Sequence, residues 1–170
     1  MNGRGRWHEL RRRNLVDASS CTVCGVPETQ PVPDQTPRNP ATSPDGNSQQ
    51  MCEDILRDSL AAYPGMKGIA LRYFNPIGAH LSALIGELPR GVPQNLVPFI
   101  TQTAAGLREC LSVLGDDSPT PAGSFIRDYT HVVDLANAHV AALTRMASHK
   151  NKKAYDNVNI GTGRGTDIPE

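Results

Sequence analysis

The chain has 170 residues, and its 17 basic and 17 acidic side chains give a formal net charge of +0. This balance argues against a nucleic-acid partner, because proteins that track phosphates carry a clustered basic excess. No apolar run approaches the roughly 18 residues that a membrane span needs, and no secretory signal follows the first arginines, so we expect a cytoplasmic protein without a membrane partner.

The first predicted element is a short apolar segment at residues 14–16, which indicates the end of a strand. A polar, proline-rich loop is expected over residues 19–44. From residue 47 the spacing of apolar side chains predicts an amphipathic helix that ends near Pro64, with Met51, Ile55, Leu56 and Leu60 on one side. The apolar run at residues 68–73 predicts the next strand.

A second loop, rich in glycine and proline, is expected over residues 75–93, and residues 111–114 predict a short strand. A helical pattern lies between them at Leu96, Val97, Ile100 and Ala104. Another helix starts near Asp134 and carries Leu135, Ala138, Ala142, Leu143 and Met146 on one side, before a closing strand at residues 158–160. Strands that alternate with helices predict an α/β fold with a largely parallel sheet, and about four strands are few for a complete doubly wound domain.

Two short motifs invite a chemical interpretation. Residues 161–165 follow a strand and contain three glycines, but their spacing is not GxGxxG, which disfavours a phosphate-binding loop. Cys21 and Cys24 form a CxxC pair that fits a redox pair or half of a zinc site. Zinc needs four ligands, and Cys52 and Cys110 lie far away in the sequence, so we expect no metal and keep a thiol protein as a minor alternative.

Three longer segments are more specific. They are LRYFNPIGAH at residues 71–80, GVPQNLVPFI at 91–100 and IRDYTHVVDLA at 126–136, followed by NIGTG at 159–163. In this order they resemble the UDP-glucose 4-epimerase family of the short-chain dehydrogenase/reductase superfamily. The resemblance implies part of an NAD(P)-binding, Rossmann-like, doubly wound parallel sheet, together with portions of the small substrate-binding region.

By this resemblance, residues 14–170 form a partial NAD-dependent epimerase domain, and residues 1–13 are an unassigned, Arg-rich N-terminal segment. The family's GxxGxxG loop and its C-terminal end have no counterpart here. The family interconverts UDP-glucose and UDP-galactose in galactose metabolism; a tyrosine phenolate takes the proton of the 4-hydroxyl, while the hydride passes to a tightly held NAD. NAD and UDP-glucose or UDP-galactose are therefore the implied ligands.

The resemblance also assigns binding roles to individual residues. Asn75 and Arg127 match family residues that contact the UDP diphosphate, a task suited to the planar, charged fork of arginine. The full set of substrate-binding candidates is Asn75, Asn95, Leu96, Arg127 and Tyr129, and the candidates for the wall beside the nicotinamide are Tyr73, Phe74 and Pro76.

The catalytic positions depart from the family. Ser20 keeps the place of a serine that hydrogen-bonds the sugar hydroxyl, but Asp45 stands at the catalytic tyrosine and Gln49 at the catalytic lysine. A carboxylate of reference pKa about 3.9 is a far weaker base than a phenolate of about 10, and glutamine has no charge to lower a neighbouring pKa. We therefore expect that the chain by itself does not epimerise.

Milder departures are Gln94 in place of an asparagine, Leu114 in place of a phenylalanine near the uracil, and Asp17 within an expected apolar strand, where a charge without a partner is costly. Two main hypotheses stay open. The chain is an inactive epimerase homologue, or it is a non-catalytic module that binds a UDP-sugar or associates with a full-length relative. An exposed apolar sheet edge, which we expect in a partial domain, favours aggregation or a partner.

Overall fold

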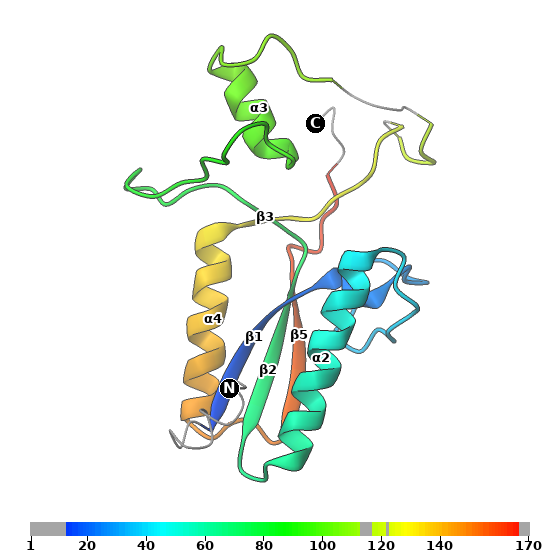
Figure 1. Ribbon diagram of the computed structural model, residues 1–170, viewed down its shortest axis with the longest axis vertical. Coiled ribbons are helices and arrows are strands. Elements are labelled where there is room, and N and C mark those ends of the chain that lie inside the picture. The colour runs from blue at the N-terminus through cyan, green and yellow to red at the C-terminus, as the bar shows by residue number, and fades with distance from the viewer. Residues whose placement is uncertain (1–12, 113–116, 122, 167–170) are drawn as a thin grey trace.

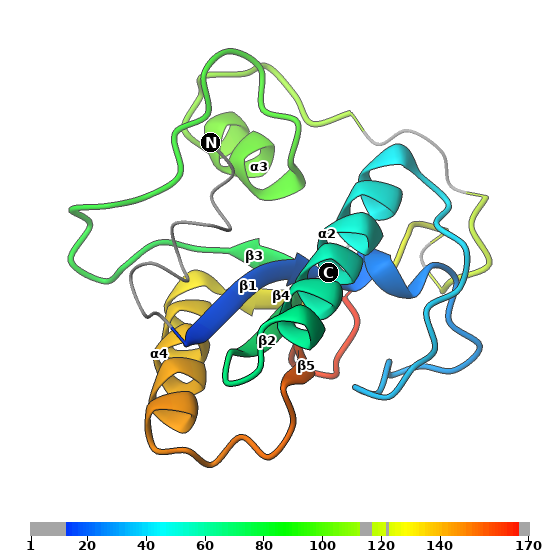
Figure 2. The same ribbon diagram turned by 60° about the horizontal axis from the view of Figure 1, so that its bottom comes forward.

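The computed structural model describes residues 13–112, 117–121 and 123–166, and a three-stranded parallel sheet forms its centre (Figure 1). The strands are β1 (Asn14–Ser20), β2 (Lys67–Tyr73) and β5 (Tyr155–Ile160), in the order β1-β2-β5. Helix α2 (Pro44–Ala62) covers one face of the sheet and helix α4 (Val132–Ala147) covers the other (Figures 1 and 2). The predicted α/β class with a parallel sheet is confirmed.

A smaller group of elements lies beyond the carboxyl ends of the three strands (Figure 1). It contains β3 (Asn75–Ile77), α3 (Leu96–Ala104) and β4 (Tyr129–His131), and β3 pairs with β4 in parallel. We predicted only a loop at residues 75–93, because a three-residue strand exists through a partner more than fifty residues away and leaves no local periodicity.

Two predictions fall wholly or partly outside the described residues. The unassigned segment 1–13 does so except for Arg13, and the expected strand at 111–114 overlaps residues 113–116, which include Leu114. Residues 111 and 112 are not in a strand. Among the described residues, no helix has both the length and the apolar character to cross a bilayer.

One face of the sheet carries the apolar core. Side chains alternate along a strand, so Ile69 and Leu71 of β2 both face α4, where they pack against Ala142 and Met146. Leu143, which the helical pattern placed on the packed side, is half exposed. The narrow sheet covers only the side of α4 that carries Ala142 and Met146.

The opposite face packs closely against α2. Gly68 makes this approach possible, because a Cβ atom there would lie 2.8 Å from Cδ1 of Leu60. Leu60 and Leu56 are buried as predicted, but Met51 and Ile55 are 53% and 46% exposed. The helical pattern predicts which side of α2 is apolar, but it does not predict how far the sheet beneath that side extends.

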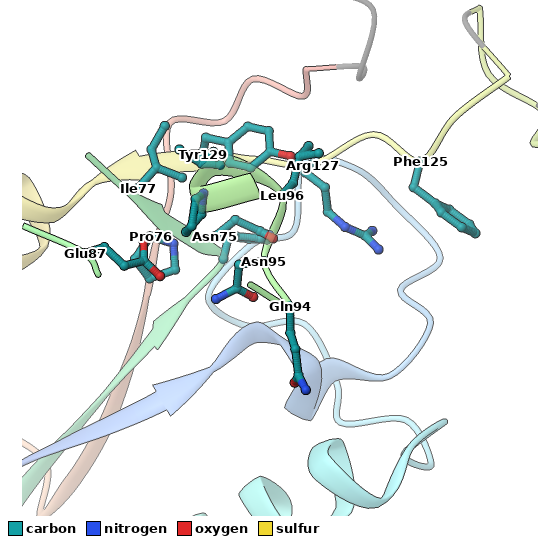
Figure 3. A pocket seen from close by; sticks show the side chains of 13 residues that line it. Asn75, Pro76, Ile77, Glu87, Gln94, Asn95, Leu96, Phe125, Arg127 and Tyr129 are labelled. Atoms are coloured by element: carbon teal, nitrogen blue, oxygen red, sulfur yellow. The ribbon is translucent and has the colours of Figure 1, made fainter. Parts of the chain in front are cut away.

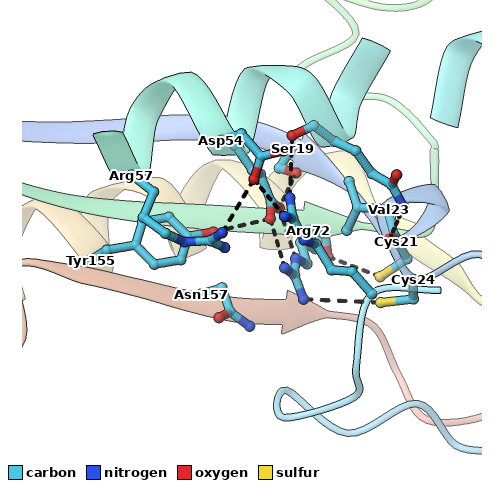
Figure 4. A network of polar contacts seen from close by, with 12 residues as sticks. Ser19, Cys21, Val23, Cys24, Asp54, Arg57, Arg72, Tyr155 and Asn157 are labelled. Atoms are coloured by element: carbon cyan, nitrogen blue, oxygen red, sulfur yellow. Dashed lines mark hydrogen bonds and ion pairs between the residues drawn. The ribbon is translucent and has the colours of Figure 1, made fainter. Parts of the chain in front are cut away.

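A buried polar network joins all three strands to α2 (Figure 4). The carboxylate of Glu53 accepts hydrogen bonds from Nε and Nη2 of Arg72 on β2 at 2.8 and 2.7 Å. It also accepts bonds from the hydroxyls of Ser19 on β1, at 2.7 Å, and Tyr155 on β5, at 3.0 Å. Burial raises the pKa of Glu53, but the bonds from Arg72 and Ser19 and the charge of Arg72 outweigh burial, so its pKa lies below the ordinary value.

The two edges of the sheet differ. The loop before α2 covers the edge of β5, where the backbone N–H of Asn159 donates to the Asp34 carboxylate at 2.7 Å and the Asn157 amide donates to the Asp34 carbonyl at 2.7 Å. Within the described residues β1 pairs only with β2. An apolar groove of about 250 Å³ lies between β1 and α2, lined by Leu15, Asp17, Cys52, Ile55, Leu56, Ser59, Leu60, Tyr63 and Met66.

Asp17, the charge within β1, faces this groove. Burial raises its pKa, and the negative charge of Glu53 raises it further. Burial and Glu53 therefore both disfavour the charged form of Asp17, the form for which the sequence predicted an energetic cost.

Helices α2 and α4 each begin at a polar side chain that accepts a hydrogen bond from a backbone amide of the first turn. Ser43 caps α2 by accepting a bond from the N–H of Gly46 at 3.0 Å, and Pro44 occupies the first turn. The helix thus starts three residues before residue 47, where the sequence pattern placed its beginning. His131 caps α4, and Asp134 lies in its first turn.

Candidate functional site

A cavity of about 470 Å³ lies above the carboxyl ends of the strands (Figure 3). It is lined by Phe74, Asn75, Pro76, Ile77, Glu87, Gln94, Asn95, Leu96, Val97, Pro98, Phe125, Arg127 and Tyr129. The five substrate-binding candidates and two of the three cofactor-wall candidates therefore line one cavity. The fold unites them because β3, the start of α3 and the approach to β4 meet at this place.

The pairing of β3 with β4 positions the cavity residues on these two strands. Asn75 lies opposite Tyr129 in the register, and the backbone N–H of Asn75 donates to the carbonyl of Asp128 at 3.0 Å. Parallel strands of open α/β sheets bring their carboxyl ends to one side, which is where ligands bind in such folds. The cavity occupies that side.

Arg127 offers uncommitted donors to the cavity. Its guanidinium lies over the ring of Phe125, 5.2 Å from the centroid, and within the described structure it forms no ion pair or side-chain hydrogen bond. The backbone N–H of Arg127 donates to the Thr166 carbonyl at 3.1 Å, and the Arg127 carbonyl accepts the N–H of Thr166 at 2.9 Å. A stacked guanidinium with free N–H groups suits the oxygen atoms of a phosphate.

The start of α3 adds a second anion-binding feature. Asn95 is the N-cap of this helix, but its side chain makes no capping hydrogen bond. The first amides of the helix, at Leu96 and Val97, therefore have no side-chain acceptor at the N-cap, and the helix dipole places partial positive charge there. Arg127 and the helix end thus offer N–H donors and positive charge to an anionic group, and Glu87 is the acidic side chain of the lining.

The glycine-rich turn at residues 161–163 is not a phosphate cradle. The backbone N–H groups of Thr162 and Gly163 both donate to the carboxylate of Asp128, at 2.9 Å each. An internal carboxylate therefore occupies the position that a phosphate would need, which agrees with the expectation from the glycine spacing.

The catalytic candidates do not line the cavity. Ser20 ends β1, and its hydroxyl accepts a bond from the N–H of Thr22 at 3.3 Å. Asp45 is exposed in the first turn of α2, and Gln49 is half-buried one turn later. In the described part of the chain no hydrogen bond connects these three side chains, although α2 and the 3-10 turn Cys21–Cys24 pack together at Gly46.

Tyr73 points away from the cavity. Nδ1 of His139 donates to the Leu135 carbonyl at 2.9 Å, and in the neutral imidazole Nε2 then accepts a bond from the Tyr73 hydroxyl at 2.6 Å. Burial, followed by the charge of Asp17, raises the pKa of Tyr73. Its neighbours Phe74 and Pro76 do line the cavity.

Burial disfavours the thiolate form of both cysteines in the CxxC pair. Cys24 is buried and Cys21 is partly buried, and burial raises the pKa of Cys21 to about 12, with Cys24 as the next cause. Thiols that attack disulfides need a substantial thiolate fraction. No group of three or more potential metal ligands occurs among the described residues.

Three features of the site escaped the sequence analysis. Glu87 and Phe125 line the cavity but belong to loops without a periodic pattern. Asp128 lies between Arg127 and Tyr129, so its place in the sequence is the one signal that marks it.

The fold and the cavity define an α/β protein with a partly polar cavity at the carboxyl ends of a parallel sheet. Residues 6–161 match the NAD dependent epimerase/dehydratase family, and the chain belongs to this family. The fold is accordingly Rossmann-like.

Several known proteins are similar to the chain in sequence and in structure. The UDP-glucose 4-epimerase of Dictyostelium discoideum is 47% identical over 160 residues, which are 94% of this chain and 46% of that protein. The one from Bacillus subtilis is 48% identical over 158 residues. The crystal structure of UDP-glucose 4-epimerase from Bifidobacterium longum, in complex with NAD+ and UDP, superposes with a TM-score of 0.88 and 41% identity over 96% of this chain and 48% of that one. The chain thus spans about half the length of these relatives.

NAD fits the described residues only in part. Phe74 and Pro76 offer a wall for the nicotinamide, but the Tyr73 hydroxyl is hydrogen-bonded to His139. The amides of the turn at 161–163 are hydrogen-bonded to Asp128. These residues supply no cradle for the pyrophosphate of a dinucleotide.

Proposed function

We propose that the cavity binds the UDP part of UDP-glucose or UDP-galactose. The observation that carries this proposal is the free guanidinium of Arg127, which faces the same cavity as the uncapped start of α3. The polar side chains of Asn75, Asn95 and Tyr129 add donors and acceptors for the nucleotide. The bound UDP in the Bifidobacterium longum relative supports the choice of nucleotide.

Titration calorimetry with UDP tests the binding. Arg127→Met should weaken the affinity for UDP about tenfold or more, because charge-assisted hydrogen bonds are worth about 1.5–3 kcal/mol each. Arg108→Met is the matched control, since Arg108 also stacks on a phenylalanine ring, 4.8 Å from the centroid of Phe99, but does not line the cavity. Equal affinities for the wild type and Arg127→Met would contradict the proposal.

We further propose that the chain by itself does not interconvert UDP-glucose and UDP-galactose. Asp45 and Gln49 stand where the family resemblance places the tyrosine base and the lysine, and neither side chain lines the cavity. Purified protein incubated with UDP-galactose and NAD+ should form no UDP-glucose in a coupled assay. Turnover above the level of a heat-denatured control would overturn this part of the proposal.

Association with a full-length epimerase is a second candidate function. It is favoured by β1, whose outer edge has no partner among the described residues, and by the apolar groove beside it. Mixing the chain with a full-length relative should shift its sedimentation coefficient. Ile55→Lys, in the exposed part of the groove, should abolish the shift, and Leu143→Lys, half exposed on α4, should leave it unchanged.

A further inference from the structure

Asp128 lies between two residues of the cavity but does not line it. Side chains alternate along an extended segment, so Arg127 and Tyr129 project to one side while Asp128 projects to the other. On that other side it meets the turn at residues 161–163.

The carboxylate makes three hydrogen bonds to the turn. Oδ1 accepts from the N–H of Thr162 at 2.9 Å and from its hydroxyl at 2.7 Å, and Oδ2 accepts from the N–H of Gly163 at 2.9 Å. The turn lies so close that a Cβ atom on Gly161 would be 2.6 Å from Oδ2 of Asp128 and 2.7 Å from the ring of Phe74. Both oxygens are thus committed to one backbone turn.

The backbone around Asp128 is tied as well. Its carbonyl accepts the N–H of Asn75, and the preceding residue, Arg127, pairs with Thr166 in an isolated antiparallel bridge. The segment is thereby held from the side of β3 and from the side of the chain after β5. The side chain of Arg127 forms no hydrogen bond or ion pair within the described residues and stacks on Phe125.

We infer that Asp128 is a positioning residue of the cavity: by clamping residues 127–129 to the turn at 161–163, it directs the Arg127 guanidinium towards a bound diphosphate. This inference rests on the proposed binding of UDP. Without the clamp only the backbone bonds to Asn75 and Thr166 hold the segment, and a small rotation of it would turn Arg127 away from the diphosphate. Asp128 itself does not touch the nucleotide.

The test compares UDP with uridine, which has no diphosphate, in calorimetric titrations of the full chain. Asp128→Asn replaces an acceptor oxygen by an N–H₂ group that faces the N–H donors of the turn. It should weaken UDP binding at least about fivefold and change uridine binding less than about twofold. Removal of a negative charge would by itself strengthen binding of an anion, so a loss cannot come from the change in net charge.

Two further variants complete the design. Asp134→Asn makes the same change of charge in the first turn of α4, away from the cavity, and should leave the ratio of UDP to uridine affinity unchanged. Thr162→Val removes one of the three bonds and should lower this ratio by a smaller factor. If Asp128→Asn gives no cooperative thermal transition, Thr162→Val decides the question.

The possible failures are distinguishable. A wild-type protein that binds neither UDP nor uridine would overturn the proposed function and, with it, this role of Asp128. A wild type that binds UDP, together with Asp128→Asn or Thr162→Val variants of unchanged affinity ratio, would overturn the clamp alone. Equal losses for UDP and uridine would also overturn it, because they would indicate a general loss of folded protein.

Discussion

The buried ion pair between Glu53 and Arg72 permits a quantitative stability prediction. Glu53 has 0% and Arg72 3% of its side chain exposed, and the two share a pair of hydrogen bonds. Glu53→Leu leaves a guanidinium without its carboxylate in a place that water does not reach, and Arg72→Leu leaves a carboxylate without its guanidinium. Each change should lower the free energy of unfolding by about 3–5 kcal/mol, because the charge left behind is no longer compensated.

The double variant removes both charges at once. It should lose at least about 2 kcal/mol less than the sum of the two single losses. Urea unfolding followed by circular dichroism measures the wild type and all three variants, and m-values must agree for the comparison to hold. Single losses that simply add would refute the reasoning that the two charges depend on each other.

A domain of this size carries about 5–15 kcal/mol of stability, so a single variant can lose its transition altogether. Tyr155→Phe then supplies the test, since it deletes only the hydroxyl that donates to Glu53 and should cost about 1 kcal/mol. No loss of stability in this variant would indicate that the hydrogen bond from Tyr155 to Glu53 does not stabilise the fold.

Two other predictions concern single residues. Asp17→Asn should raise the midpoint of thermal unfolding at pH 7 but not at pH 3. Folding raises the pKa of Asp17, so its charged form destabilises the fold only above the unfolded pKa of about 3.9. Equal effects at both pH values would contradict this. Gly161→Ala should cost about 1–3 kcal/mol and weaken UDP binding, since its Cβ atom would meet Asp128 and Phe74. Gly86→Ala is the control, because its Cβ atom would find only an ordinary contact at 3.7 Å, and a neutral Gly161→Ala in the same urea titrations would refute the close packing.

The sequence alone was sufficient where structure depends on neighbours along the chain. The apolar run at 68–73 became β2, and the spacing of Leu56 and Leu60 correctly gave the buried side of α2. The motifs around Asn75 and Arg127 indicated which residues would share a site, and the structure brings them to one cavity. Periodicity and motif order are local properties, so they can be recognised before any partner is known.

The tertiary structure decided everything that depends on a distant partner. Glu53 and Arg72 lie 19 residues apart, and nothing in their local patterns marks a buried pair; Asp128 is flanked by residues of the site, but its bonds go to a turn more than thirty residues later. Ile55 belongs to the same apolar pattern as Leu56 yet remains exposed, because its burial depends on how far the sheet extends. A side chain's burial and charge state are set by what the fold places opposite it, which the spacing of residues along one segment does not contain.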